Sequence, residues 1–127
     1  MKNQVALTLT TSDTSEIKLF EIGNSYDMIK DAVHGWIECV RLNKGIDMWL
    51  NEEGKMLESC QYNPTATAIF WTTYGFMSDQ IFGDVIFASS SDEGETIGLN
   101  LEQIEYLKEI ALDVVGIKPV LPLTSSL

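Results

Sequence analysis

The residues best suited to holding a ligand gather around one asparagine–proline step. Asn63 is a typical N-cap of a helix, and Pro64 is typical of its first position, where the missing N–H has no partner in any case. The free N–H groups at such a helix start can bind an anion, and Lys55 lies nearby in the sequence. Trp71 and Tyr74 are three residues apart, so they could present an aromatic stacking surface. The ligand-binding candidates are therefore Lys55, Asn63, Thr65, Thr67, Trp71 and Tyr74.

The same residues also have a purely structural interpretation, which we favour. Every helix has such a start and few carry ligands, and a small domain needs most of its aromatic rings in the core. The preceding stretch LNEEGK, residues 50–55, is typical of a hairpin turn. In that turn Asn51 would bond its own backbone two residues on, and Gly54 would take a left-handed conformation. Glu52 and Glu53 would lie at its solvated tip.

The other reactive side chains are too few and too scattered to indicate catalysis. The single histidine, His34, is expected at a helix end, where its side chain would interact with the last carbonyls. Cys39 and Cys60 fall in expected strands, and buried cysteines are usually inert. These three residues give no zinc spacing, and the stretch SDEGE lacks the alternating carboxylates of a calcium loop. With no Walker loop and no dinucleotide fingerprint, we expect no catalytic residues, no metal and no cofactor.

Negative charge is the strongest signal of the composition. Among 127 residues, 8 Lys and Arg face 19 Asp and Glu, which gives a net charge of −11. No Lys or Arg lies between Lys55 and Lys108. Such a surface repels nucleic-acid phosphates and could attract a basic protein surface, although the same charges also serve solubility. The candidates for a partner-binding surface are Asp92, Glu93, Glu95, Glu102 and Glu105.

Apolar periodicity and turn residues predict the elements that must position these side chains. Strands are expected at 4–10, 16–22, 36–42, 45–50, 56–62 and 79–89, helices at 24–35, 63–76 and 100–115, and a surface loop at 90–98. Ser25 is expected to cap the first helix and Gly35 to end it. Asn100 and Gln103 resemble a capping box at the start of the last helix.

Two helical stripes are expected to face the core. The first contains Tyr26, Ile29 and Val33, and the last contains Leu101, Ile104, Leu107, Ala111 and Val114. The order of hairpins and helices predicts an α+β domain, in which a largely antiparallel mixed sheet carries about three helices on one face. We expect a single domain over residues 1–117 and an extended C-terminal tail over residues 118–127, which two prolines interrupt.

Four segments in this order resemble an uncharacterised domain family common in phages and mobile elements. They are HGWIECVRL, DMWLNEEGKM, NPTATAIF and DQIFGDVIF, within residues 30–88. The motif positions are Asn51, Glu52, Gly54, Lys55, Asn63, Ala66, Thr67, Gly83 and Asp84. Trp36 stands where the family pattern usually has a second glycine, and ESCQ replaces the usual leucine–proline lead into Asn63. The resemblance implies a phage or mobile-element accessory protein in a bacterial host, and it supplies no activity.

Charge, motifs and resemblance together lead to one expected function and one alternative. We expect a phage-type accessory protein that binds and modulates a host protein with a basic surface, in host takeover or counter-defence. The alternative is a small-ligand or nucleotide-sequestering protein that uses the helix start at Asn63 and the aromatic pair. We expect no membrane partner, because no apolar run approaches the roughly 20 residues of a membrane helix. Without a signal peptide or a disulfide framework, a cytoplasmic location is expected, and the oligomeric state stays open.

Overall fold

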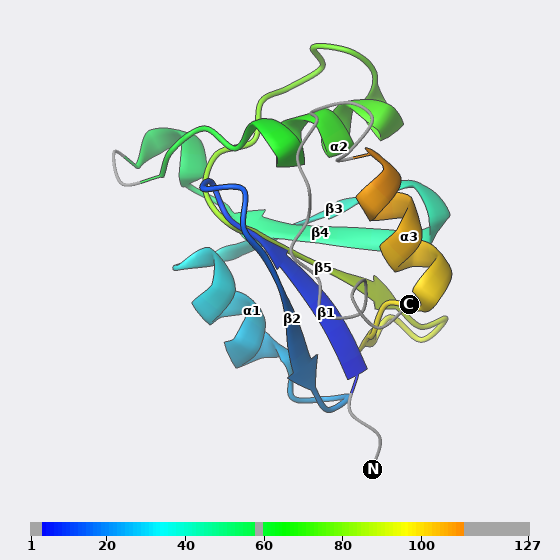
Figure 1. Ribbon diagram of the computed structural model, residues 1–127. Coiled ribbons are helices and arrows are strands. Elements are labelled where there is room, and N and C mark those ends of the chain that lie inside the picture. The colour runs from blue at the N-terminus through cyan, green and yellow to red at the C-terminus, as the bar shows by residue number, and fades with distance from the viewer. Residues whose placement is uncertain (1–3, 58–59, 111–127) are drawn as a thin grey trace.

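The strands form one antiparallel sheet (Figure 1). The structure, a computed structural model, describes residues 4–57 and 60–110. Its elements are β1 (Gln4–Leu9), β2 (Ser15–Phe20), α1 (Ser25–Val33), β3 (Ile37–Arg41), β4 (Ile46–Asn51), α2 (Pro64–Tyr74), β5 (Val85–Ser90), β6 (Thr96–Ile97) and α3 (Leu101–Ile110). Two short 3-10 turns, η1 (Asn43–Gly45) and η2 (Gly54–Met56), follow β3 and β4. The strand order is β2-β1-β5-β4-β3, with β6 beside the end of β5. The predicted α+β class is confirmed.

Helices cover both faces of the sheet, and the prediction that they lie on one face is wrong. The central strand β5 shows why, because its side chains alternate between two cores. Val85 and Phe87 pack in the core under α2 and α3, whereas Ile86 and Ala88 pack under α1. A strand buried on both faces has no polar side, so its sequence VIFAS does not reveal which face a helix covers.

Two predicted helix starts are confirmed in atomic detail. The side chain of Asn63 accepts the backbone N–H of Ala66 at 3.0 Å, directly before Pro64. Asn100 and Gln103 form the predicted capping box, because each side chain accepts the other's backbone N–H, at 2.8 and 2.9 Å. These caps depend on contacts between residues close in sequence, so the sequence alone can specify them.

The ends of α1 differ from the prediction. Asn24, and not Ser25, occupies the N-cap position, and its side chain makes no capping bond. The left-handed residue at the other end is His34, with φ of 64°, and not Gly35. Gly35 is required for a different reason. A Cβ there would lie 2.7 Å from Nδ2 of Asn51, so only glycine allows this side chain to approach.

The segment after β4 does not turn back as a hairpin but connects this strand to α2. The predicted strand at 56–62 is wrong for its described residues, 56–57 and 60–62, none of which lies in a strand, and β4 already has β3 and β5 as its two neighbours. Of those described residues, Tyr62 alone pairs, in an isolated bridge with Phe82. The expected strand at 79–89 begins only at Val85, and the expected loop at 90–98 contains β6. Gly54 is buried where a Cβ would meet the Phe82 carbonyl oxygen at 2.8 Å, so close approach and not a left-handed turn requires it.

Other details of this region agree with the sequence. Oδ1 of Asn51 accepts the backbone N–H of Glu53 at 2.8 Å, as predicted, and both Glu52 and Glu53 are exposed. In the helical stripes Ile29, Val33, Ile104 and Leu107 are buried. Tyr26 and Leu101 were predicted to be buried as well, but they are 51% and 55% exposed. Ala111, Val114, the domain end at 117 and the tail at 118–127 lie outside the described residues.

No helix within residues 4–57 and 60–110 has the length and apolar character needed to cross a membrane.

Candidate functional site

Asn63, the centre of the predicted anion site at the start of α2, has its side chain bonded to the protein itself. Asn63 is fully buried, and its amide donates to the carbonyl of Leu9 at 3.3 Å and to that of Gly83 at 2.9 Å. Its oxygen accepts the N–H of Ala66. All of these bonds join Asn63 to backbone groups, so the side chain fastens α2 to β1 and to the segment before β5.

The two threonine candidates serve the same purpose. The hydroxyl of Thr67 donates to the carbonyl of Asn63 at 2.8 Å and accepts the N–H of Ile81 at 2.9 Å. Thr65 is also fully buried, and its hydroxyl donates to the carboxylate of Asp13 at 3.3 Å. The start of α2 is therefore held by hydrogen bonds to three separate segments of the chain.

The remaining ligand candidates do not join them in one site. Lys55 forms an ion pair with Asp79, and the indole N–H of Trp71 donates to the backbone carbonyl of Asp79. Trp71 packs edge-on against Phe76, with ring centroids 5.0 Å apart. Tyr74 instead stacks on Phe70 at 4.6 Å, and its hydroxyl donates to a carbonyl of β3. Each ring thus has its own partner, so they do not form one platform.

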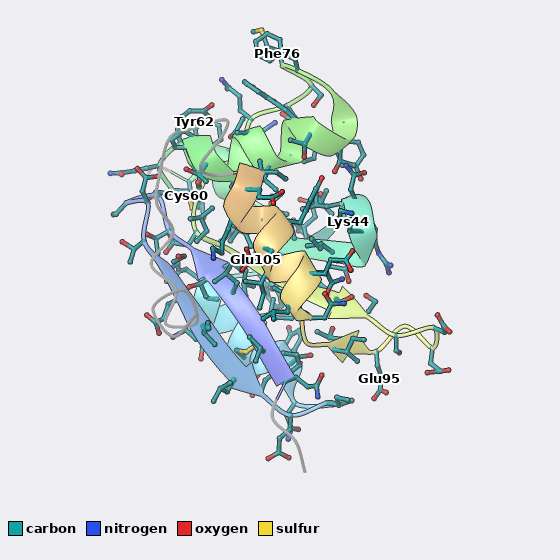
Figure 2. All side chains as sticks on the ribbon, turned by 45° about the vertical axis from the view of Figure 1, so that its right-hand side comes forward. Lys44, Cys60, Tyr62, Phe76, Glu95 and Glu105 are labelled. Atoms are coloured by element: carbon teal, nitrogen blue, oxygen red, sulfur yellow. The ribbon has the colours of Figure 1, made fainter. Side chains whose placement is uncertain are left out.

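The five acidic candidates fall into two groups. Asp92, Glu93 and Glu95 are exposed on the turn between β5 and β6, and within the described residues no basic side chain lies within 4 Å of them. Glu102 and Glu105 lie on α3, where Lys44 is 4.0 Å from the first and Lys108 is 3.2 Å from the second. Figure 2 shows Glu95 on the projecting turn, apart from Glu105 on the helix.

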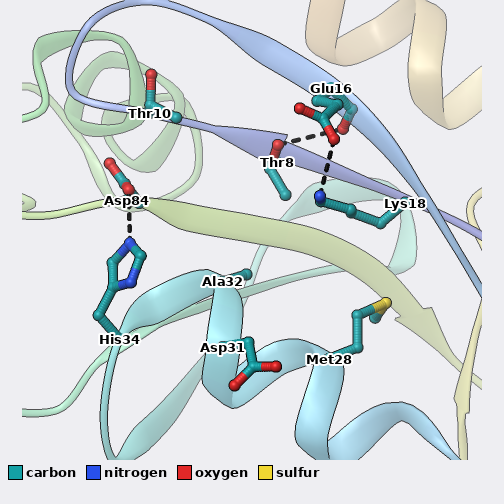
Figure 3. A pocket seen from close by; sticks show the side chains of 9 residues that line it. All are labelled: Thr8, Thr10, Glu16, Lys18, Met28, Asp31, Ala32, His34 and Asp84. Carbon is teal, nitrogen blue, oxygen red and sulfur yellow. Dashed lines mark hydrogen bonds and ion pairs between the residues drawn. The ribbon is translucent and has the colours of Figure 1, made fainter.

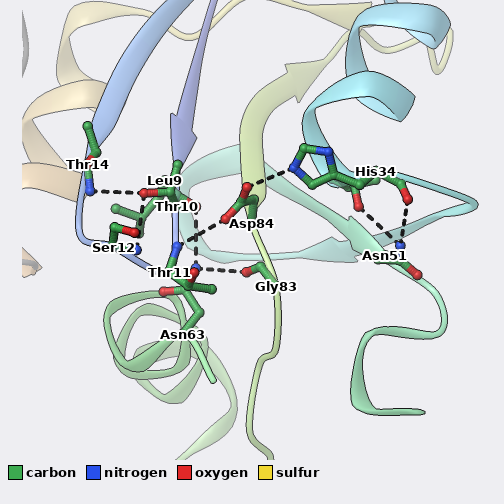
Figure 4. A network of polar contacts seen from close by, with 11 residues as sticks. Leu9, Thr10, Thr11, Ser12, Thr14, His34, Asn51, Asn63, Gly83 and Asp84 are labelled. Carbon is green, nitrogen blue, oxygen red and sulfur yellow. Dashed lines mark hydrogen bonds and ion pairs between the residues drawn. The ribbon is translucent and has the colours of Figure 1, made fainter. Parts of the chain in front are cut away.

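A polar pair that the sequence analysis missed lies where α1 ends and β5 begins. Asp84 accepts the backbone N–H of Thr11 at 3.1 Å, and its other oxygen lies 2.9 Å from Nε2 of His34 (Figures 3 and 4). The ring therefore contacts a carboxylate 50 positions away, and the expectation that it binds the helix-end carbonyls is wrong. No local sequence signal could reveal such a contact.

Hollows adjoin the His34–Asp84 pair on two sides. One has a volume of about 480 Å³ and is lined by Thr8, Thr10 and Lys18 among others (Figure 3). The other has about 300 Å³ and is lined by residues that include Cys60 and Gln61. An imidazole held by a carboxylate can bind a polar ligand or exchange a proton with it.

Four of the motif positions of the resemblance, namely Asn51, Asn63, Gly83 and Asp84, meet in one polar network that includes this pair (Figure 4). Asn51 donates to the carbonyls of Val33 at 3.1 Å and His34 at 3.4 Å. Asn63 bonds the carbonyl of Gly83, and the next residue is Asp84. The network joins the ends of β1, α1, β4, α2 and β5, so these motif positions have a structural role in holding the fold together.

The cysteines give little support to a thiol reaction. The pKa of the Cys39 thiol is raised to about 11, first by burial and then by the neighbouring carboxylate of Asp47, against the lowering effect of Arg41. The thiol therefore stays protonated at neutral pH, where it is a poor nucleophile. Among residues 4–57 and 60–110, no three His, Cys, Asp or Glu side chains are grouped so as to hold a metal ion.

Comparison with known families gives one match. A family model described as a domain of unknown function (DUF3846) matches residues 5–111. The match extends well beyond the 30–88 segment on which the resemblance was based. Neither the curated proteins nor the solved structures contain a match to this chain.

Proposed function

Because the chain belongs to the DUF3846 family, a family defined without a function, we propose its role from its surface chemistry. The role is that of a small acidic phage-type accessory protein in the cytoplasm of a bacterial host. There it binds a host protein through a basic surface of that protein and modulates it. No reaction is part of this proposal.

The observation that carries the proposal is the unpaired acidic turn between β5 and β6. Each Lys or Arg in the described residues already has a partner, which is a carboxylate for Lys18, Arg41, Lys44, Lys55 and Lys108, and the Trp36 ring for Lys30. Asp92, Glu93 and Glu95 have no such cation nearby within that part of the chain. Three exposed carboxylates on a projecting turn can attract a basic surface and accelerate its association.

A second candidate function is supported by the hollow of about 480 Å³ beside His34 and Asp84. Its lining combines the carboxylates of Glu16, Asp31 and Asp84 with Lys18 and His34, so it offers both charge signs to a small polar ligand. The small-ligand alternative then has its site at the end of α1, whereas the sequence suggested the start of α2. Mass spectrometry of a denatured extract of the purified protein tests it, since a bound metabolite would be released there.

Two matched triple variants test the protein-binding proposal. The first neutralises the turn through Asp92→Asn, Glu93→Gln and Glu95→Gln. The second removes the same charge from exposed positions elsewhere, through Glu21→Gln, Glu53→Gln and Glu109→Gln. A partner is captured from bacterial lysate with the unchanged protein and purified, and its association rate is measured at several salt concentrations.

We expect the turn variant to associate several times more slowly, with a weaker salt dependence, and the matched variant to change much less. Complementary charge acts mainly on the association rate, so dissociation should be similar for all three proteins. Equal association rates for the two variants would remove the turn from binding and leave its charges with solubility alone.

A further inference from the structure

Strand β3 forms an edge of the sheet, and its hydrogen-bonding pattern shows which backbone groups point outward. The N–H of Glu52 bonds the carbonyl of Trp36 at 2.9 Å, and the N–H of Leu42 bonds that of Ile46 at 2.8 Å. In an antiparallel pair such bonded positions alternate along the strand. The backbone N–H and C=O groups of Trp36 and Leu42 therefore point toward β4, as do those of the even positions between them. The same groups of Ile37, Cys39 and Arg41 point away from the sheet.

Much of this outer edge is open. The carbonyl of Arg41 accepts the hydroxyl of Tyr74, which closes one end. The outward groups of Ile37 and Cys39 bond no other backbone or side-chain group in the described parts of the chain. No residue of β3 is buried. An exposed strand with free backbone groups is a template for pairing with another extended chain.

The opposite edge, β2, is better protected. Lys18 and Glu16 form an ion pair at 2.8 Å along that strand, and an edge lysine is a common device against strand pairing. The β3 sequence, IECVR, contains neither lysine nor proline. Its arginine is drawn to the buried Asp47, with Nε 3.3 Å from the carboxylate. Of the two edges, β3 is therefore the one that lacks a lysine or proline to oppose strand pairing.

A groove of about 410 Å³ runs beside β3 on the face that α2 covers. Apolar side chains line it, namely Val40, Leu50, Met56, Phe70, Ile81 and Phe82. Two exposed carboxylates, Glu38 and Glu52, also line it, and no described cation lies within 4 Å of either. Lys55 and Asp79 neutralise each other at the same groove. An apolar floor therefore carries an excess of negative charge.

We propose that β3 is the docking strand for an extended, basic segment of a protein partner, which adds to the sheet as a further edge strand. The segment places a Lys or Arg opposite Glu38 and an apolar side chain opposite Val40, over the groove. Backbone bonds to Ile37 and Cys39 hold it, and side chains at alternate positions select it. This inference rests on the proposed function, because it specifies the kind of partner segment that such a protein would bind.

Amide hydrogen exchange followed by NMR tests the docking directly. In the free protein the amides of Ile37 and Cys39 should exchange much faster than those of Glu38 and Val40, which bond to β4. The probe is a capped peptide of sequence TKTVTKT, which puts Lys, Val and Lys on one face in either chain direction. Its saturating addition should slow the Ile37 and Cys39 amides, whereas the matched acidic peptide TETVTET should have little effect.

Two variants make the test specific to the edge. Of the backbone donors, Cys39→Pro removes only the outward N–H of this residue, so it should leave the β3–β4 pairing intact and abolish binding of TKTVTKT. Leu19→Pro is the matched control on β2. There the bond from the N–H of Thr10 to the carbonyl of Thr14 places Leu19 among the outward residues, and this variant should bind normally. Glu38→Lys, which alters no backbone group, should lower the affinity about fivefold and favour TETVTET.

Several outcomes would overturn the inference. One is that TKTVTKT, at saturating concentration, leaves the exchange of Ile37 and Cys39 unchanged. Another is equal protection by the acidic peptide. A third is slow exchange of both amides in the free protein that deepens with protein concentration, because a second copy of the chain would then cover the edge. The proposed function would still stand if a captured partner bound Cys39→Pro normally but associated slowly with the variant of the acidic turn.

Discussion

Gly54 shows how one missing side chain fixes the path of the chain. It lies against the carbonyl of Phe82, and this contact brings the segment after β4 next to the segment before β5. The sequence identifies Gly54 as special but assigns it the wrong reason, because a glycine after two glutamates is typical of a turn. The close approach depends on a residue 28 positions away, which periodicity and turn chemistry do not report.

The two reasons predict different responses to substitution. Gly54→Ala should destabilise the protein by about 1–3 kcal/mol, because the new methyl group meets a backbone oxygen at 2.8 Å. Gly54→Asn should be at least as costly, although asparagine tolerates a left-handed turn well. Glu53→Ala is the control and should change the free energy of unfolding by less than about 0.5 kcal/mol. Urea denaturation measures all three, and a tolerated Gly54→Asn would restore the turn interpretation.

A further prediction for a single residue concerns the pH dependence of the alkylation of Cys39. Its pKa is raised from 9.0 to about 11, first by burial and then by Asp47. The thiolate is the reactive form, so the rate of alkylation should keep rising until the pH nears 11. Iodoacetamide labelling of a Cys60→Ser variant, followed by mass spectrometry, measures this rate for Cys39 alone. Asp47→Asn should move the midpoint to lower pH, whereas a plateau already near pH 9 in the parent would contradict the prediction.

Both α2 and α3 begin with an asparagine N-cap, so the two helices show how much the surroundings of a cap contribute to stability. Asn100 caps α3 at an exposed site by accepting one N–H, whereas Asn63 caps α2 and also donates to the carbonyls of Leu9 and Gly83. Asn100→Ala should therefore cost about 1 kcal/mol, the usual contribution of a cap. Asn63→Ala should cost about 2–4 kcal/mol, since it also removes two buried hydrogen bonds, to the carbonyls of Leu9 and Gly83.

Urea denaturation of the two variants makes the comparison. The difference between the two losses measures the contribution of the bonds from Asn63 to Leu9 and Gly83. Similar losses for both asparagines would show that the bonds to Leu9 and Gly83 contribute little. In that case the polar network at this end of the sheet would not be what fastens α2 to the strands.

The same contrast explains which elements the sequence predicts well. The N-cap at Asn63 and the capping box at Asn100 and Gln103 depend on neighbours within three residues, and both are confirmed. The expected strand at 56–62 contains suitable residues, but pairing requires a free neighbour, and β3 and β5 already flank β4. The His34–Asp84 pair is formed only once α1 and β5 meet, so no spacing in the sequence announces it.

At the scale of the whole molecule, the dominant feature is the excess of negative charge. With a net charge of −11, the folded state brings like charges closer together than the unfolded chain does. Most of the local attraction is already used, because the basic side chains that the structure describes are paired. Long-range repulsion should therefore be the electrostatic term that responds most to salt.

Stability should accordingly rise with salt. The Debye length falls from about 30 Å at 0.01 M to about 8 Å at 0.15 M, so repulsion across the molecule is screened over this range. The free energy of unfolding, from urea denaturation at each salt concentration, should increase.

The turn variant and the variant at Glu21, Glu53 and Glu109 should weaken this salt dependence to a similar extent, because long-range repulsion depends little on where the charge lies. A stability that falls with salt would instead show that the local ion pairs dominate. Since both variants alter stability alike, a difference between them in partner association would have to come from the acidic turn itself.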